Sequence, residues 1–480
     1  MKKSNFGQFL LLLLFISFSF FSCEKENENS RLSEKTQVIT FAYDCMSTYY
    51  LWNKNVPALN LKNEANTDPY DYFEKIRYVD DRWSMLTDDV KSLSESLSGT
   101  GTTFGYSLAL GTFSDDPDNV FAVVLFTYPG SPAEIAGLKR GDFIIGMNDR
   151  PITRDNYTDL FYASNLNLNL GYLQGETVYP GGSVSLQARN MYLNPVNKYK
   201  IIEKGNHKIG YLFYTDFLLQ SHNELQNVFD YFKQNNVTDV VLDLRYNSGG
   251  YVITSELLAS ILAPASAIQS KAIFNKEIWN DEWTEYFRQE GIDSNSYFTS
   301  VLKYEDDNGK PVEEPIRSNM DLSRLYVITG MNTASASESL IIGLAPYLNV
   351  ITIGEVTFGK FCGGSVFSPN QIYTKPDPAI SNWGAYTMLY RFADKDGITN
   401  CINGYKPNYL MDDLFYERNI PLGDENEYLL AKALSLILGY DLAAIRSGEE
   451  RSKSNFRAIP NLKTRSNDFQ GKLIDPIRFP

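Results

Sequence analysis

The sequence predicts a multidomain α/β protein whose 480 residues contain three structured segments with different patterns of apolar residues and glycine. Apolar and aromatic residues recur at roughly helical spacing over residues 38–90, which predicts an N-terminal helical domain. Short β-branched runs punctuated by glycine follow over residues 99–198 and predict a β-rich domain. Strand-like and helical segments alternate over residues 205–446, as in a layered α/β domain.

The N-terminus is typical of an exported protein. Two lysines precede an apolar run over residues 9–21, which is too short to span a bilayer comfortably and fits a signal peptide over residues 1–22. The small Ser22 precedes Cys23, as at a bacterial lipoprotein cleavage site, so we expect lipid on Cys23. An ordinary signal peptide with an incidental cysteine is the alternative. Residues 23–37 then form a polar, lipid-anchored linker.

The acidic start of this linker, CEKENE, resembles the surface-export signals of Bacteroidetes lipoproteins. That resemblance implies a cell-envelope protein anchored to the outer membrane, on its periplasmic or surface side. Without residues 1–22 the chain keeps 42 basic and 58 acidic residues, a formal charge near −16. Such a surface repels phosphate groups, so we expect no nucleic-acid partner and contact with the membrane only through the lipid.

Cysteine and histidine are too sparse for a metal centre. After Cys23 the chain has only Cys45, Cys362 and Cys401, without a C-x-x-C pair, and its two histidines are isolated. We therefore expect neither a metal nor another cofactor. A disulfide between Cys362 and Cys401 and free, buried thiols both remain open.

The β-rich segment has an order of its own. A strand is expected over residues 120–126, a short helix ended by glycine within residues 129–142, and a strand with a turn over residues 143–152. This order, with GSPAEIAGLKRGDFIIGMNDRPI at residues 130–152, resembles a PDZ domain. The resemblance implies that a loop before the first strand captures a peptide's terminal carboxylate with its N–H groups while the peptide extends the sheet; the loop consists of Phe104, Gly105, Tyr106 and Ser107.

The α/β segment contains two strand–helix–strand units. Strands over residues 209–217 and 238–244 flank an amphipathic helix over residues 219–234. Strands over residues 325–329 and 350–353 flank a helix that begins near Ser335. The polar tail over residues 447–480 is expected to be flexible.

Hydroxyl side chains occupy every second position at the start of that second helix, at Thr333, Ser335, Ser337 and Ser339. At a helix N-terminus, unpaired N–H groups can stabilise the anion that a serine nucleophile generates. Ser335 also suits an ordinary capping box, because Glu338 follows three residues later. On this stretch alone, both interpretations stay open.

Two neighbouring loops favour catalysis. The apolar strand of VVLDLRYNSGG ends in Gly249 and Gly250, whose N–H groups can approach a substrate oxygen closely, as an oxyanion hole requires. Lys360 follows Ser335 by 25 residues, one helix and one strand later, so a parallel return would bring it to the same sheet end. A desolvated lysine can be neutral and act as a general base in place of histidine. The segment GEVTFGK is not a nucleotide loop, since Phe361 stands where Ser or Thr is needed.

Together these segments resemble the C-terminal processing (tail-specific) serine peptidases; the resemblance is carried by VVLDLRYNSGG, TASASES, GEVTFGK, GYKPN and the PDZ-like segment ahead of them. It implies a crotonase-like α/β catalytic domain with Ser335 as nucleophile and Lys360 as base. It also implies an oxyanion hole from the N–H groups of Gly250 and Ala336, with Gly249 binding substrate. Family members often carry Gln or Glu four residues after the lysine, where this chain has Gly364, so the third catalytic residue is unassigned.

The sequence thus predicts an exported serine endopeptidase that cleaves polypeptides near their free C-termini by a Ser-Lys acyl-enzyme mechanism. A peptide-binding surface lipoprotein without catalytic activity is the alternative.

Overall fold

The computed structural model describes residues 32–113, 118–174, 177–305, 310–413, 420–439, 456–458 and 472–474. The expected signal peptide and the lipidation site Cys23 lie outside the described residues, as does most of the linker. No helix within these ranges is both long and apolar enough to cross a lipid bilayer.

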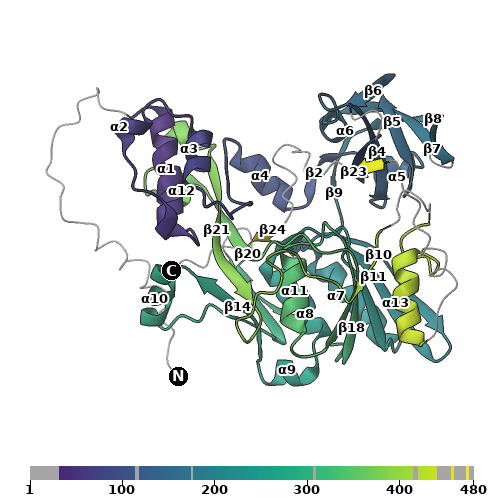
Figure 1. Ribbon diagram of the computed structural model, residues 1–480. Helices are drawn as coiled ribbons and strands as arrows, with labels where there is room; N and C mark the ends of the chain where they lie inside the picture. Colours follow the sequence, from purple (N-terminus) through teal and green to yellow (C-terminus); the bar gives the residue numbers. More distant parts are fainter. Residues whose placement is uncertain are drawn as a thin grey trace.

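Helices α1 (Glu34–Thr48), α2 (Leu61–Glu64) and α3 (Pro69–Ile76) form the N-terminal region. The side chain of Ser33 caps α1, and Asp68 followed by a proline starts α3, as N-terminal capping favours. The buried residues of α1 and α3 share one hydrophobic core with the long strand β21 (Gly384–Ala393). The short strand β1 (Met85–Thr87) also pairs with β21, so this region is built onto the sheet that contains β21 (Figure 1).

The β-rich domain, at the upper right of Figure 1, contains a seven-stranded sheet in the order β23-β3-β4-β6-β5-β7-β8. Its strands are β3 (Tyr106–Phe113), β4 (Asn119–Thr127), β5 (Phe143–Met147), β6 (Arg150–Thr153), β7 (Asn165–Gln174), β8 (Thr177–Gln187) and β23 (Phe456–Ala458), with helices α5 (Pro132–Ile135) and α6 (Asp159–Tyr162) and a separate pair, β2 (Thr100–Thr103) and β9 (Arg189–Tyr192). The expected strands at 120–126 and 143–152 and the short helix between them are confirmed; the turn inside 143–152 is made by Asn148 and Asp149, both at positive φ.

The α/β domain contains a six-stranded sheet in the order β10-β11-β12-β18-β19-β22. Its strands are β10 (Val196–Lys204), β11 (His207–Tyr214), β12 (Asp239–Asp243), β18 (Arg324–Thr329), β19 (Asn349–Gly354) and β22 (Tyr409–Leu410). Strands β11, β12, β18 and β19 run parallel, and the expected helix after β11 is α7 (His222–Gln234), preceded by the 3₁₀ turn η3 (Leu219–Ser221). The predicted alternation of strands and helices is confirmed.

Alternate residues of these parallel strands divide the core into two layers. Tyr211, Phe213 and Ile328 pack with helix α13 (Tyr428–Leu438) on one face. Leu212, Tyr214 and Val327 face the other layer, which holds α7, α8 (Val252–Leu262) and α11 (Ala336–Leu344). Figure 1 shows α8 and α11 side by side, with α13 at the opposite end of the domain.

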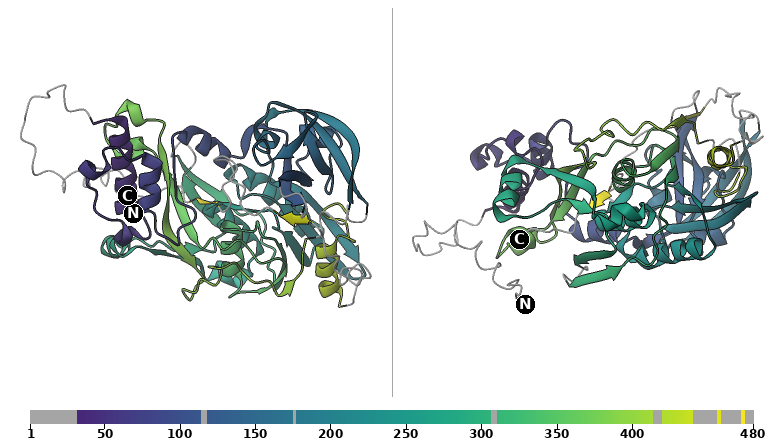
Figure 2. Two further views of the ribbon diagram at one scale, coloured as in Figure 1. Left: turned by 45° about the horizontal axis from the view of Figure 1, so that its top comes forward. Right: turned by 90° about the horizontal axis from the view of Figure 1, so that it is seen from below.

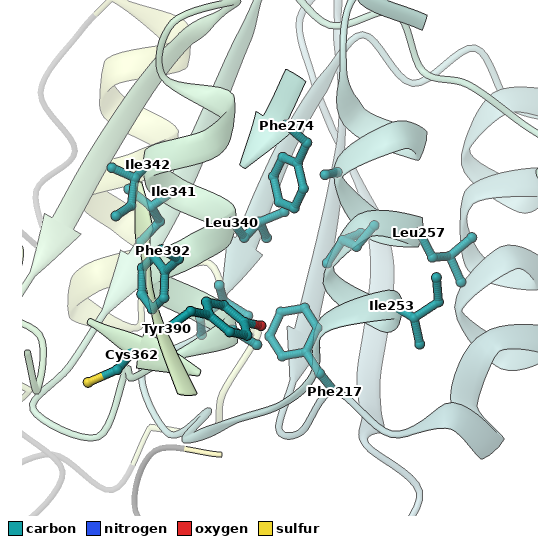
Figure 3. Packing of buried hydrophobic residues seen from close by; sticks show 14 of the residues in the cluster. Phe217, Ile253, Leu257, Phe274, Leu340, Ile341, Ile342, Cys362, Tyr390 and Phe392 are labelled. Atoms are coloured by element: carbon teal, nitrogen blue, oxygen red, sulfur yellow. The ribbon is translucent and has the colours of Figure 1, made fainter. Parts of the chain in front are cut away.

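A second sheet, in the order β13-β24-β20-β21-β14-β15, lies against α8 and α11. Its strands besides β21 are β13 (Gly249–Tyr251), β24 (Lys472–Ile474), β20 (Cys362–Phe367), β14 (Ile273–Trp279) and β15 (Ser296–Tyr297). Figure 3 shows the core between them, where Leu340 and Ile341 of α11 approach Tyr390 and Phe392 of β21, while Leu257 of α8 lies beyond Phe274. Further elements at the periphery are η2 (Asn53–Asn55), α4 (Val90–Leu97), α9 (Ala265–Gln269), α10 (Asp281–Glu290), β16 (Val301–Glu305), β17 (Pro311–Pro315), α12 (Pro369–Ile372) and η4 (Pro378–Ile380). Figure 2 shows the N-terminal helices and the β-rich domain at opposite ends of the molecule.

The structure corrects one expectation from the sequence, on the tail, and decides an open one, on the cysteines. The tail, expected to be flexible, contains two strands, β23 and β24, that pair with β3 in one domain and with β13 and β20 in the other. Cys362 and Cys401 are both buried free thiols, so the disulfide alternative is wrong and the free-thiol alternative holds.

Candidate active site

Ser335 lies between strand β18 and helix α11, at the carboxyl end of the parallel strands. Its backbone has φ 60° and ψ −112°, a combination that residues other than glycine rarely adopt. The residue is fully buried, and within the described residues its Oγ has no hydrogen bond of normal geometry. Backbone strain and a buried hydroxyl without a hydrogen bond both destabilise the fold. Such features occur at catalytic sites, where the strained turn holds a nucleophile in position.

The capping box expected at Ser335 is present, with the two residues arranged in both directions as such a box requires, but only one of its two bonds has normal hydrogen-bond geometry. The Glu338 N–H faces the Ser335 side chain as in such a box, but the bond that meets normal geometry is the reverse one, from the Ser335 N–H to the Glu338 Oε2 at 2.9 Å. The helix is therefore capped through Glu338, which leaves the Ser335 hydroxyl available.

Glu338 also binds the loop that carries Lys360. Its carboxylate accepts the N–H of Gly359 at 2.8 Å, the N–H of Lys360 at 2.9 Å and the hydroxyl of Thr357. With the Ser335 N–H, four donors meet one fully buried carboxylate. Burial raises the pKa of Glu338 to about 7, although these hydrogen bonds lower it. One side chain thus fixes the backbone of both expected catalytic residues.

Lys360 comes to this point because β18 and β19 are adjacent and parallel, with α11 between them in the chain. Its side chain is fully buried, and its Nζ donates to the hydroxyl of Tyr386 at 2.8 Å. The same Nζ lies 4.9 Å from the centre of the Tyr386 ring. Tyr386 on β21 therefore holds the end of the lysine side chain, a role that the sequence left unassigned.

Gly364 has no room for the Gln or Glu that the resemblance associates with its position. A Cβ there would lie 2.5 Å from the Met388 Cε and 2.5 Å from the Thr387 carbonyl oxygen. The close pairing of β20 with β21 that excludes a side chain is the same pairing that brings Tyr386 to Lys360.

The loop from Arg245 to Gly250 packs directly against the Ser335 loop. Asn247 organises the contact: its carbonyl accepts the Ala334 N–H at 3.1 Å, and its Oδ1 lies 3.0 Å from the Ser337 hydroxyl and 2.9 Å from the Gly249 N–H. Ser337 therefore serves this contact, and Ser339 binds Asn275 instead. Thr333 bonds the Leu244 carbonyl at 2.7 Å.

Gly250 presents its backbone in a defined direction. The Gly249 carbonyl and the Tyr251 N–H bond to Phe217 on one side, at 2.9 and 2.8 Å. Because successive peptide groups of a strand point to opposite sides, the N–H of Gly250 faces the other side, where β24 lies. A Cβ on Gly250 would lie 2.2 Å from the Phe217 carbonyl oxygen, so this path requires glycine. Ala336, the other expected donor, is the first residue of α11.

A buried network of ion pairs holds the loop from Arg245 to Gly250 in place. Arg245 is fully buried and pairs with Asp243 at 2.8 Å, Glu427 at 2.8 Å and Asp413 at 3.2 Å. Burial tends to raise the pKa of Glu427, but the charge of Arg245 and its hydrogen bonds outweigh that effect and keep the pKa below its ordinary value. Arg140 of the β-rich domain also binds Asp413, at 2.5 Å, and so ties the two domains together.

The expected carboxylate-binding loop, Phe104 to Ser107, lies in the β-rich domain and is not brought to Ser335. The Gly105 N–H is already bonded to the Thr103 hydroxyl at 3.0 Å, and the Gly105 carbonyl to the Tyr128 N–H at 2.9 Å. Ser335, Lys360, Gly249, Gly250 and Ala336, by contrast, all lie on loops that share hydrogen bonds. The sequence pattern indicates Glu338 only as a helix-capping residue and does not indicate Tyr386.

Two protein-family models match the chain. Residues 208–403 match the model of peptidase family S41, and residues 37–85 match the model of the peptidase S41 N-terminal domain. The matches span 196 and 49 residues, or 245 of 480, just over half of the chain.

Individual relatives are distant. The chain is 27% identical over 317 residues to the chloroplastic carboxyl-terminal-processing peptidase 2 of Arabidopsis thaliana, covering 64% of this chain and 54% of the relative. It is 24% identical over 297 residues to the carboxy-terminal processing protease CtpA of Bacillus subtilis, covering 59% and 53%. The chain thus spans about half the length of these curated relatives.

A crystal structure described as that of an S41 protease from Bacteroides fragilis shares the fold, with a TM-score of 0.66 and 24% identity over 88% of this chain and 99% of that one. The matched family segments include the N-terminal helices and the strands that position Ser335 and Lys360. The chain is a member of peptidase family S41, the family of the C-terminal processing proteases.

Proposed function

We propose that this protein is an exported serine endopeptidase that cleaves polypeptides near their C-termini, with Ser335 as nucleophile and Lys360 as general base. The observation that carries the proposal is the shared carboxylate of Glu338, which binds the N–H groups of both residues inside a buried site. A scaffold that only bound peptides would gain nothing from a strained serine whose buried hydroxyl lacks a partner.

The proposed reaction begins with the neutral amine of Lys360. Burial makes an ammonium costly and so favours the amine, while the bond to Tyr386 orients it. The amine takes the Oγ proton as Ser335 attacks the carbonyl carbon of the scissile bond. The resulting ammonium then returns the proton to the departing amine, and an acyl-enzyme remains. Water activated by Lys360 hydrolyses that ester and restores the serine.

The N–H groups of Gly250 and Ala336 are proposed to stabilise the oxyanion, with Gly249 adjacent to the substrate. Asn247 and the buried pairs of Arg245 hold the glycine loop in place before substrate arrives. Such preorganised donors need no rearrangement as charge develops in the transition state. Tyr386 and Glu338 act as positioning residues.

We further propose that the β-rich domain is a PDZ domain that captures the substrate's free C-terminus at Phe104 to Ser107, and that Cys23 carries lipid at the outer membrane. The strand that follows this loop, β3, pairs with β4 on one edge and accepts an added strand on the other. Strand addition of this kind is the usual mode of PDZ recognition.

Replacing Ser335 by alanine tests the nucleophile. We expect Ser335→Ala to lower the rate of cleavage of denatured proteins by about 10³ or more, since no other group can form the acyl-enzyme. Mass spectrometry of the products gives the readout. The matched control, Ser337→Ala, loses the two hydrogen bonds of its hydroxyl to Asn247, each worth about 1 kcal/mol, and should retain activity within about tenfold. Equal cleavage by wild type and Ser335→Ala, or no cleavage by wild type on any substrate, would favour the peptide-binding alternative.

Substrate termini test the PDZ proposal. One polypeptide, prepared with a free and with an amidated C-terminus, should be cleaved with a lower KM in the free form, because amidation removes the negative charge proposed to bind at this loop. We expect a difference of about tenfold in kcat/KM, the effect of one charge-assisted contact. Equal kcat/KM values for the two forms refute carboxylate capture.

The titration of Glu338 provides a pH-dependent test of the buried carboxylate that joins the Ser335 and Lys360 loops. Its folded pKa, about 7, lies above its ordinary value of 4.5, so it favours folding most below about pH 4.5, and this contribution is lost as the pH rises to about 7. Glutamine at this position stays neutral throughout. The free energy of unfolding of wild type, relative to Glu338→Gln, should therefore fall by about 3 kcal/mol over that interval, measured by denaturant titration at several pH values. A difference that does not change with pH contradicts this assignment.

A further inference from the structure

We propose that the chain's own C-terminal segment occupies the substrate position of the active site and acts as a built-in competitive inhibitor. The inference rests on the proposed peptidase function. It is carried by the two short strands of the tail, β23 and β24, drawn as yellow arrows in Figure 1: one lies on the β-rich domain and the other beside β20.

Strand β24 fills a gap in the second sheet, between β13 and β20. It runs parallel to β13 on one side, with Leu473 opposite Gly250, and parallel to β20 on the other, with Ile474 opposite Gly364. Strands β13 and β20 do not pair with each other, so β24 alone joins them within the described sheet. Neighbouring strands in a sheet lie about 4.8 Å apart, so β13 and β20 are separated by about two such spacings. The gap between them therefore has room for one extended polypeptide.

The strands on both sides of this gap come directly from the catalytic loops. Strand β13 contains Gly249 and Gly250, and β20 begins two residues after Lys360. The Gly250 N–H, the proposed oxyanion donor, points away from Phe217 and toward β24. A substrate that is to be cut by Ser335 needs the same N–H group. Tail and substrate therefore compete for one position.

The other tail strand occupies the proposed capture edge. Strand β23 pairs antiparallel with β3, Phe456 opposite Phe113 and Ala458 opposite Gly111, on the edge away from β4. This is the edge at which a captured peptide would extend the sheet. A single stretch of chain thus covers the peptide-binding backbone of both domains.

The tail is suited to reversible occupancy. Each strand pairs over only three residues, so either one can open locally at small cost. Because the tail belongs to the same chain, its effective concentration at the site is of the order of millimolar, so even a weakly binding tail competes with substrate. The site is therefore closed to weak or dilute peptides and opens to those that bind well or engage both domains.

Proline in β24 of the full-length chain tests the proposal. Leu473→Pro removes a backbone N–H from a strand that is paired on both sides, and its ring is incompatible with a central strand. Leu473→Ala is the matched control, since it keeps the N–H. We expect Leu473→Pro to increase hydrogen exchange of residues 249–251 and 362–367, while Leu473→Ala exchanges as wild type does.

Kinetics of the same variants give the functional readout. If the tail occupies the site nine-tenths of the time, its release lowers KM about tenfold and leaves kcat unchanged. Unchanged exchange and unchanged KM in Leu473→Pro overturn the proposal. Greater exchange with a lower kcat also overturns it, because β24 would then be a structural part of the second sheet. Loss of the tail from wild type but not from Ser335→Ala, seen by intact mass, overturns it in favour of self-processing.

A binding measurement separates this inference from the peptidase function itself. A fluorescent peptide of residues 468–480 should bind the double variant Ser335→Ala/Leu473→Pro, followed by anisotropy, at least tenfold more tightly than Ser335→Ala with its native tail. This result requires no catalysis and supports tail occupancy even if no substrate is ever cleaved. Equal binding to both variants rejects tail occupancy, whatever the activity of the wild type.

Discussion

The buried carboxylate of Glu338 is the interaction on which the site depends. Four donors converge on its two oxygens, from Ser335, Thr357, Gly359 and Lys360, in a place that water does not reach. Without an acceptor, three backbone N–H groups would be buried and unpaired, at a cost of about 1–3 kcal/mol each. The carboxylate therefore closes two loops onto each other, and it makes the capping bond of normal geometry at α11, whereas the Ser335 hydroxyl makes none.

The fold brings the groups to this carboxylate by simple topology. Parallel strands β12, β18 and β19 end at one edge of the sheet, so the loops after them meet there. The loop after β12 brings the two glycines, the loop after β18 brings Ser335, and the loop after β19 brings Lys360. Burial of Arg245 with its three carboxylates holds the first of these loops from the side opposite Glu338. The site is thus assembled between two buried polar clusters, and each of them is internally paired.

Much of this arrangement can be predicted from the sequence, because it is local. Ser335 and Lys360 are separated by one helix and one strand, and a parallel return requires no knowledge of distant partners. The adjacent glycines likewise indicate a point where the backbone can be approached closely by another group. Tyr386 could not be found in this way, since its contact with Lys360 follows from the register of β20 with β21. The same limit applies to β24: a polar tail of low apolar content gives no local sign that it will pair with β13, which precedes it by more than 200 residues.

Catalysis in this site requires Lys360 to act as the base for Ser335, and an arginine in its place separates that role from peptide binding. Lys360→Arg keeps a long side chain that ends in nitrogen, but its guanidinium stays protonated and therefore cannot accept the hydroxyl proton. In single-turnover cleavage, with peptide affinity measured in parallel on the same variant, we expect an affinity close to that of wild type and a rate lower by about 10³. A Lys360→Arg protein that cleaves at the wild-type rate, or that does so until His222 is also replaced, would show that Lys360 is not the base.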